Sequence, residues 1–355
     1  MIRFSDPELV INVARIVGMA TLTFLTAFFL TPLLTHYLYK YNFGKNIRNE
    51  GKTPYYSKLH AKKAGTPVGG GIIIWFSVMA LAVLFWIAHL VLPSSIASHL
   101  NFLTRAQTLL PLGALVASAL VGLFDDYFNV RKIGPNGGGL NMAHRLVLYT
   151  IVAAFGAWWF FFKLDWSFIH VPGYADIEIG WRYIPLFMFV IIASAFSVNE
   201  ADGLDGLAGG ILVFCFGAYT ALAFALGKVE LAIFCASITG GLLAFLWFNV
   251  YPARFFMGDT GAMSLGTTLG VIAMLTNSAL VLPIIAFPLV IESGSVIIQL
   301  ISKKIFHRKI FLSTPIHHHF EAIGWPETKV TMRFWIIAAV TASVGLVIAL
   351  LGMGT

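Results

Sequence analysis

Long apolar segments alternate with short polar links along almost the whole chain. Ten of these segments approach the roughly 20 apolar residues that a helix needs to cross a bilayer. They lie at about 12–38, 67–92, 107–124, 144–163, 184–199, 207–226, 231–249, 262–277, 281–301 and 332–352. The pattern predicts an all-α, polytopic integral membrane protein with about ten transmembrane helices.

The polar links differ in positive charge. With their flanking residues, the links near 39–66, 125–143, 200–206, 250–261 and 302–331 hold 17 Lys and Arg residues, whereas the other links and the termini hold six. Because Lys and Arg are enriched in cytoplasmic loops, we expect the first group to face the cytoplasm and both termini to lie outside. In the outer link 164–183, alternating stretches flank Pro172 and Gly173, which indicates a small periplasmic β-hairpin.

Composition agrees with a membrane protein. Of the 355 residues, 58% are hydrophobic and 11% are charged, whereas soluble domains carry about 25% charged residues. So few polar groups cannot cover a water-soluble globule. The net charge of +7 indicates membrane anchoring and an anionic substrate rather than nucleic-acid binding. Without visible repeats or a separate soluble segment, residues 1–355 are expected to form a single transmembrane domain.

Two adjacent acids, Asp125 and Asp126, follow the third apolar segment. That segment runs from outside to inside, so the pair lies at a helix C-terminus, where the helix dipole disfavours negative charge. Repulsion between the two carboxylates adds to this. A solvated interfacial pair is one explanation. A role with a metal ion or a phosphate explains better why both acids lie there.

A second acidic cluster joins spans five and six. It includes Asn199, Asp202 and Asp205, with glycines after both acids. Asp202 and Asp205 share one side if the turn is helical. Asp205 could be only the N-cap of the next helix, but this leaves Asp202 and the glycines unexplained. Glycines beside acids let the backbone approach a bound phosphate or nucleoside closely.

The link between spans seven and eight combines Asn249, Arg254, Phe256 and Asp259. Asp259 could again be an N-cap. An amide, a guanidinium, an aromatic ring and a carboxylate together are more typical of a nucleotide or metal site than of a helix cap.

Three consecutive histidines, His317, His318 and His319, lie in the last inner link. They cannot all face one metal from a helix or strand, and the spacing typical of zinc ligands is absent. Histidines can instead donate to phosphate oxygens or stabilise developing charge. A solvated basic loop is the alternative.

These groups converge on one membrane face. A carboxylate-rich site with a divalent cation and nearby basic residues suits phosphoryl transfer to or from a membrane lipid. The rival class is a secondary transporter. Transporters place charges near the bilayer midplane and often show repeat symmetry, whereas here Glu292 is the only acid within an expected span.

Several motifs taken together resemble one family over essentially the whole chain. The motifs are Phe-Asp125-Asp126-Tyr, Asn199-x-x-Asp202-Gly-Leu-Asp205-Gly-Leu-Ala, Asn249-x-x-Pro-Ala-x-x-Phe256-Met-Gly-Asp259-x-Gly, and Pro-Ile-His317-His318-His319-Phe-Glu followed by Gly-Trp-Pro-Glu. They resemble the phospho-N-acetylmuramoyl-pentapeptide transferases, within the polyprenyl-phosphate N-acetylhexosamine-1-phosphate transferase family. A transferase for another UDP-N-acetylhexosamine is the alternative within that family.

The resemblance implies a reaction. UDP-MurNAc-pentapeptide would donate its phospho-sugar to undecaprenyl phosphate, with Mg²⁺ as cofactor, giving lipid I and UMP in peptidoglycan synthesis. It also implies ten transmembrane helices and a homodimer. The setting would be a bacterial inner membrane, with the active site on the cytoplasmic face.

The resemblance also implies roles for single residues. Asp259 looks like the metal ligand, and Asp125, Asp126 and His318 look like catalytic residues. The positions expected to bind substrate are Lys63, Asn199, Asp202, Gly203, Leu204, Asp205, Asn249, Phe256, His317 and His319. Among these, Gly203, Leu204, Asp205 and Phe256 would line a uridine pocket. The chain departs from the family at Asn129, where the family has Lys, at Glu200-Ala201, where it has Leu-Thr, and at Val68-Gly69, where it has Thr-Met.

Overall fold

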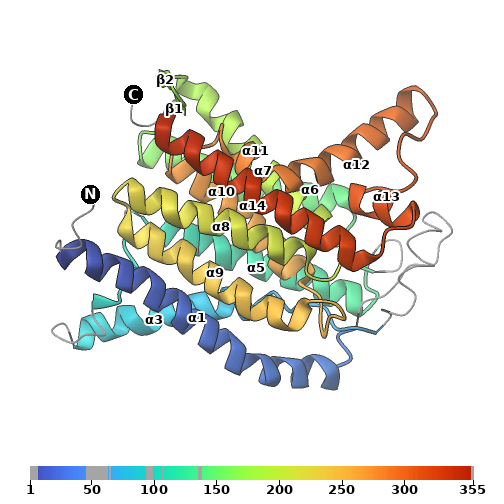
Figure 1. Ribbon diagram of the computed structural model, residues 1–355, viewed down its shortest axis with the longest axis horizontal. Coiled ribbons are helices and arrows are strands. Elements are labelled where there is room, and N and C mark those ends of the chain that lie inside the picture. Colours follow the sequence, from blue (N-terminus) through green and yellow to red (C-terminus); the bar gives the residue numbers. More distant parts are fainter. Residues whose placement is uncertain are drawn as a thin grey trace.

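The computed structural model describes residues 7–44, 63, 65–92, 99–105, 107–134 and 138–352. Ten long helices in these ranges form one bundle (Figure 1). They are α1 (Pro7–Lys40), α3 (Ile72–Val91), α5 (Leu109–Val130), α6 (Met142–Lys163), α7 (Tyr183–Ala201), α8 (Leu207–Ala225), α9 (Val229–Asn249), α10 (Gly258–Leu275), α12 (Phe287–Ile305) and α14 (Glu327–Gly352). The shorter elements are β1 (Phe168–Val171), β2 (Ala175–Glu178), η3 (Gly180–Arg182), α11 (Leu282–Ile285) and α13 (Ile316–Ala322).

Eight of the described helices are long and apolar enough to cross a membrane: α1, α3, α5, α6, α7, α8, α9 and α14. The prediction of a polytopic all-α membrane protein is therefore confirmed. The two remaining expected spans, 262–277 and 281–301, coincide with α10 and with α11 plus α12. The start of α1 and the end of α14 lie at one end of the bundle, and α13 lies at the other (Figure 1).

Helix α10 lies at the centre of the bundle. It packs against α5 and α7 and also contacts α3 and α8, and every residue from Asp259 to Leu275 is buried. A Cβ added at Gly266 would lie 2.7 Å from the Cα of Ala195 in α7, so the two backbones can approach only because Gly266 has no side chain. Because protein rather than lipid surrounds α10, it tolerates polar residues such as Ser264 and Thr268, whose hydroxyls donate to carbonyls of their own helix.

The expected span 281–301 is not one continuous helix. It divides into α11 and α12 at Ala286, whose φ of −102° and ψ of 29° are not helical. Pro288, near the start of α12, has no N–H to continue the hydrogen bonds of a preceding helix. From this break α12 leans away from α14 (Figure 1).

The β-hairpin predicted in the link 164–183 is present. Strands β1 and β2 pair antiparallel, with Val171 opposite Ala175. The hairpin lies beside the C-terminal end of α14 (Figure 1), where the ring of His170 contacts the carbonyl of Gly352 at 3.2 Å.

Candidate active site

A cavity of about 280 Å³ lies at the α13 end of the bundle, bordered by the last turns of α5 and α7 and the first turn of α10. Its lining residues are mostly polar, and they come from segments far apart in the sequence. They are Val68, Asp126, Asn129, Arg145, Asn199, Glu200, Asp202, Gly203, Phe256, Gly258, Asp259, Pro315, His317 and His318. Tertiary packing thus brings together the motifs that the sequence separates.

The N-terminus of α10 gathers acids around it. The N–H of Gly258 donates to Asp202 Oδ2 at 3.1 Å. The N–H groups of Asp259 and Thr260 donate to the two carboxylate oxygens of Asp126, each at 3.0 Å. The N-cap residue of α10 itself makes no side-chain hydrogen bond. Acids from α5 and from the end of α7 therefore satisfy the free N–H groups of α10, and its positive dipole end stabilises them.

Arg145, in the first turn of α6, links three of the polar side chains. Its Nε donates to Asp125 Oδ2 at 2.8 Å, its Nη1 to Asn199 Oδ1 at 3.1 Å and its Nη2 to Asp259 Oδ2 at 2.7 Å. The second oxygen of Asp125 accepts the N–H of Leu140 at 2.6 Å. These contacts offset the dipole and the charge repulsion that the sequence predicts for the acid pair at the end of α5.

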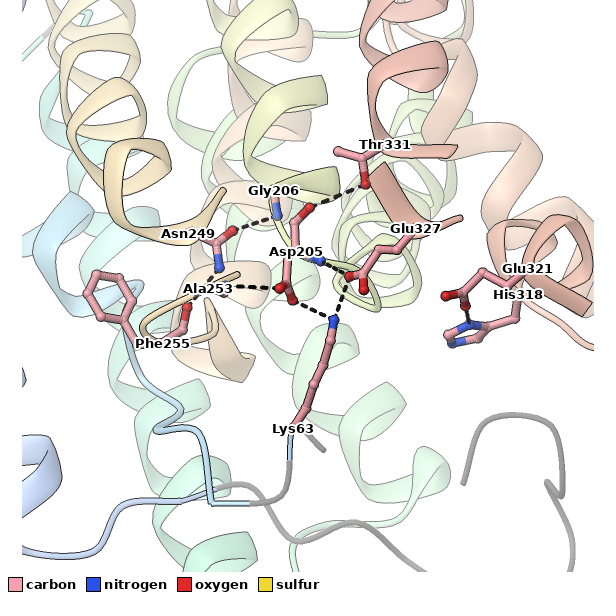
Figure 2. A network of polar contacts seen from close by, with 10 residues as sticks. All are labelled: Lys63, Asp205, Gly206, Asn249, Ala253, Phe255, His318, Glu321, Glu327 and Thr331. Carbon is pink, nitrogen blue, oxygen red and sulfur yellow. Dashed lines mark hydrogen bonds and ion pairs between the residues drawn. The ribbon is translucent and has the colours of Figure 1, made fainter. Parts of the chain in front are cut away.

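A second network lies around Lys63 (Figure 2). The Lys63 ammonium donates to Asp205 Oδ1 at 2.6 Å and to Glu327 Oε1. The backbone N–H of Asp205 donates to the same oxygen of Glu327 at 2.7 Å, and Asp205 Oδ2 accepts the N–H of Ala253 at 3.0 Å. This network joins the link between α1 and α3, the turn before α8, the link before α10 and the start of α14.

Asn249 supports the same turn from α9. Its Oδ1 accepts the N–H of Gly206 at 3.0 Å and its Nδ2 donates to the carbonyl of Phe255 at 2.7 Å (Figure 2). Gly206 is the N-cap of α8, with φ of 75°, so Asp205 is not the cap that the alternative interpretation required. The ring of Phe256 lines the cavity, and the Lys63 ammonium lies 5.8 Å from the ring centroid.

Two of the three histidines line the cavity, and each is paired with a glutamate. His317 Nδ1 lies 2.8 Å from Glu292 Oε2, and His318 Nδ1 lies 2.7 Å from Glu321 Oε2. His319 is directed elsewhere: its Nδ1 accepts the N–H of Leu312 at 3.2 Å.

The cavity brings together many of the predicted site residues. Those lining it are Asp126, Asn199, Asp202, Gly203, Phe256, Asp259, His317 and His318. Asp125 contacts the cavity through Arg145, whereas Lys63, Asp205 and Asn249 belong to the adjoining network. Leu204 is buried, and neither it nor His319 is among the lining residues.

Sequence reasoning missed several polar residues. Arg145 counted only toward the positive charge of the inner links, although an arginine in the first turn of an apolar helix is itself a signal. Glu327 belongs to the Gly-Trp-Pro-Glu stretch, and Glu321 follows the histidines, but neither was given a role. Glu292 was noted only as an acid within a span, and its partner could not be identified from sequence.

The donor chemistry fits a magnesium ion at Asp259. Its two carboxylate oxygens each accept one hydrogen bond, from Arg145 and from Asn199, and each keeps a further lone pair. The described residues contain no group of three or more His, Cys, Asp or Glu placed to hold a metal. Mg²⁺ does not need such a group, because it commonly binds one or two carboxylates and completes its shell with substrate phosphates and water.

Fold and cavity together define a polytopic membrane protein with a site for phosphate chemistry at one end of its helical bundle. Residues 108–277 match the family described as glycosyl transferase family 4. Three similar proteins carry the name phospho-N-acetylmuramoyl-pentapeptide-transferase. The protein from Bacillus anthracis (strain A0248) is 38% identical over 338 residues, covering 94% of this chain and 95% of the relative.

The protein from Geobacillus sp. (strain WCH70) is 36% identical over 333 residues, covering 92% of this chain and 95% of the relative. The protein from Geobacillus thermodenitrificans (strain NG80-2) is 36% identical over 347 residues, covering 96% and 98%. At this identity and coverage, the chain belongs to the phospho-N-acetylmuramoyl-pentapeptide transferase family, as its motifs predict.

Proposed function

We propose that this protein transfers phospho-MurNAc-pentapeptide from UDP-MurNAc-pentapeptide to undecaprenyl phosphate, releasing UMP and forming lipid I. The observation that carries the proposal is the cavity between α5, α7, α10 and α13, where acids, Arg145 and two histidines meet beside an aromatic ring. Such a site, next to the lipid phase, suits a reaction between a water-soluble diphosphate and a lipid phosphate.

The uridine end of the donor is assigned to the wall that includes Phe256 and the turn 202–206. An aromatic ring packs well on a flat base, and the Lys63 network stabilises the turn from behind. The diphosphate then extends toward Arg145 and Asp259. This order places the cleaved bond among the cationic and metal-binding groups.

Asp259 is proposed to hold Mg²⁺, with the donor's phosphate oxygens as further ligands. When bound there, Mg²⁺ would supply electrostatic shielding between two anionic substrates and would stabilise negative charge on the leaving phosphate. Arg145 already holds the Asp259 carboxylate at 2.7 Å and so orients it toward the cavity.

We propose direct attack rather than a covalent enzyme intermediate. An oxygen of the lipid phosphate attacks the β-phosphorus of the donor, the bond from the β-phosphorus to the bridging oxygen breaks, and UMP leaves with that oxygen. All four carboxylate oxygens of Asp125 and Asp126 already accept hydrogen bonds. Engaged in this way, they are better suited to position groups than to act as nucleophiles.

The inner membrane of a bacterium is the proposed location, with the cavity on the cytoplasmic face and the protein as a homodimer. The distribution of Lys and Arg among the links supports the orientation.

The experiment is UMP release by purified protein with Mg²⁺, undecaprenyl phosphate and a panel of UDP-sugars. We expect release with UDP-MurNAc-pentapeptide and its loss in EDTA; preference for another UDP-N-acetylhexosamine would overturn the proposal. Direct attack is tested by exchange of labelled UMP into the donor on enzyme stripped of polyprenyl phosphate. Label in the donor would show a covalent intermediate.

A further inference from the structure

Two carboxylate–imidazole pairs stand side by side at the α13 wall of the cavity. His318 and Glu321 are three residues apart on α13, with side chains only 9% and 6% exposed. His317 pairs with Glu292 of α12, and both of these side chains are fully buried. The His317 and His318 rings pack edge to face with centroids 4.1 Å apart.

Each pair uses the same ring nitrogen. In both histidines Nδ1 faces a glutamate oxygen; where that glutamate is ionised, Nδ1 carries the hydrogen and donates it to the carboxylate. With Nδ1 engaged in this way, Nε2 is the nitrogen through which each ring contacts groups other than its glutamate. Figure 2 shows the His318–Glu321 pair to one side of Lys63 and Asp205.

The fully buried His317–Glu292 pair packs beside the His318–Glu321 pair. A Cβ added at Gly203 would lie 2.2 Å from His317 Nε2, so this ring fills the space between α12 and the turn before α8. Glu292 lies within α12, and its Oε1 is buried with no hydrogen-bond partner in the described part of the chain. An acid retained within an expected span, here 281–301, is a functional-site candidate.

We propose that Glu321 is a positioning residue that holds His318 with its Nε2 toward the cavity, where Nε2 contacts a phosphate oxygen of the donor. Glu292 acts in the same way on His317, whose ring supports that of His318 from behind. With Nδ1 already donating, an N–H at Nε2 makes the ring an imidazolium. The Glu321 carboxylate compensates that positive charge, so the proton can be taken up when the diphosphate binds. This inference rests on the proposed function for the identity of the phosphate ligand.

The test is a double-mutant cycle on donor affinity, measured by calorimetry with UDP-MurNAc-pentapeptide and no lipid carrier, so that turnover is not needed. Glu321→Ala should weaken binding about tenfold, the effect of losing a hydrogen bond to a charged group. Glu321→Gln, which keeps an acceptor, should weaken it less. In a His318→Ala background, Glu321→Ala should change affinity less than twofold. The matched control is Glu230→Gln, an acid in the first turn of α9 outside this site.

Two results would overturn the inference. One is a loss from Glu321→Ala that is equally large with and without His318, since Glu321 would then act by itself. The other is an unchanged affinity in His318→Ala. The Glu292–His317 pair is tested by the same cycle: the effect of Glu292→Ala on donor affinity is measured with and without His317→Ala.

Nitrogen-15 spectra of the histidine rings provide a readout that does not require a folded Glu321 variant. Assigned by comparison with His318→Ala, the wild-type spectrum should show His318 protonated at Nδ1 without ligand and at both nitrogens with donor. A hydrogen on Nε2 alone would refute the assignment. Failure of the proposed function is seen separately, as absence of UMP release by the wild-type protein.

Discussion

Replacement of Arg145 is the most direct test of how the site is held together. Its guanidinium makes three hydrogen bonds, two of them to the carboxylates of Asp125 and Asp259, while the side chain is 19% exposed. In Arg145→Ala, Asp125 and Asp259 lose the cation that lies between them beside a cavity that must accept a diphosphate. The network also loses the group that orients Asp259.

The size of the effect follows from these contacts. Removing one partner of a buried ion pair costs about 3–5 kcal/mol, and a hydrogen bond to a charged group contributes about 1.5–3 kcal/mol. Because the guanidinium is partly exposed, we take about 3 kcal/mol. This corresponds to a loss of roughly a hundredfold in kcat/KM. Arg145→Lys keeps the charge but not the fork of donors, so a smaller loss of about tenfold is expected.

The assay is UMP release at saturating Mg²⁺, with thermal unfolding of each purified variant measured in parallel. Arg182→Ala is the matched control. Arg182 is the exposed N-cap of α7, and the opposite end of α7 is the one that borders the cavity. If Arg145→Ala keeps more than a third of wild-type kcat/KM, then Arg145 does not organise the site as described.

Three further predictions concern the walls of the cavity. Phe256→Ala should raise KM for the donor about tenfold through loss of stacking on the base, and an unchanged KM would remove Phe256 from the uridine wall. Glu327→Gln should raise the donor KM several-fold, because it weakens the contacts to Lys63 and to the Asp205 N–H; an effect on kcat alone, with KM unchanged, would argue against this. Glu200→Leu should leave donor affinity unchanged or increase it, because a carboxylate beside a diphosphate repels it. Arg145 attracts Glu200 electrostatically, so the gain should be small, and a calorimetric loss of affinity would assign Glu200 a positive role.

Much of the architecture could be predicted without coordinates. Ten apolar segments at membrane-spanning length, the uneven distribution of Lys and Arg, and the hairpin around Pro172 and Gly173 follow from local composition and periodicity, which each segment carries by itself. The family likewise follows from short motifs whose residue order is preserved in the chain. These features depend on residues that are close together in the sequence, so one amino-acid sequence is enough to predict them.

Local composition did not predict what surrounds the central helix α10. The segment 262–277 was expected as an ordinary span. It is enclosed by other helices and contains serines and threonines that bond within the helix. Likewise, the break at Ala286 divides a segment expected as one span; Pro288 is compatible with a break there, but the hydrophobic pattern of the segment does not reveal it.

The contacts within the site were decided by tertiary structure alone. Asp125 and Asp126 point about 100° apart on a helix, so the sequence predicts different parts for them, but only the packing shows that Asp125 binds Arg145 and Asp126 caps α10. Asp205 and Asp259 each allowed an interpretation as a simple N-cap, and only the packing shows that they bind Lys63 and Arg145 instead. The sequence determines which residues carry charge and which segments enter the membrane. Which charges meet depends on how helices far apart in the chain pack together, and that is a property of the whole bundle.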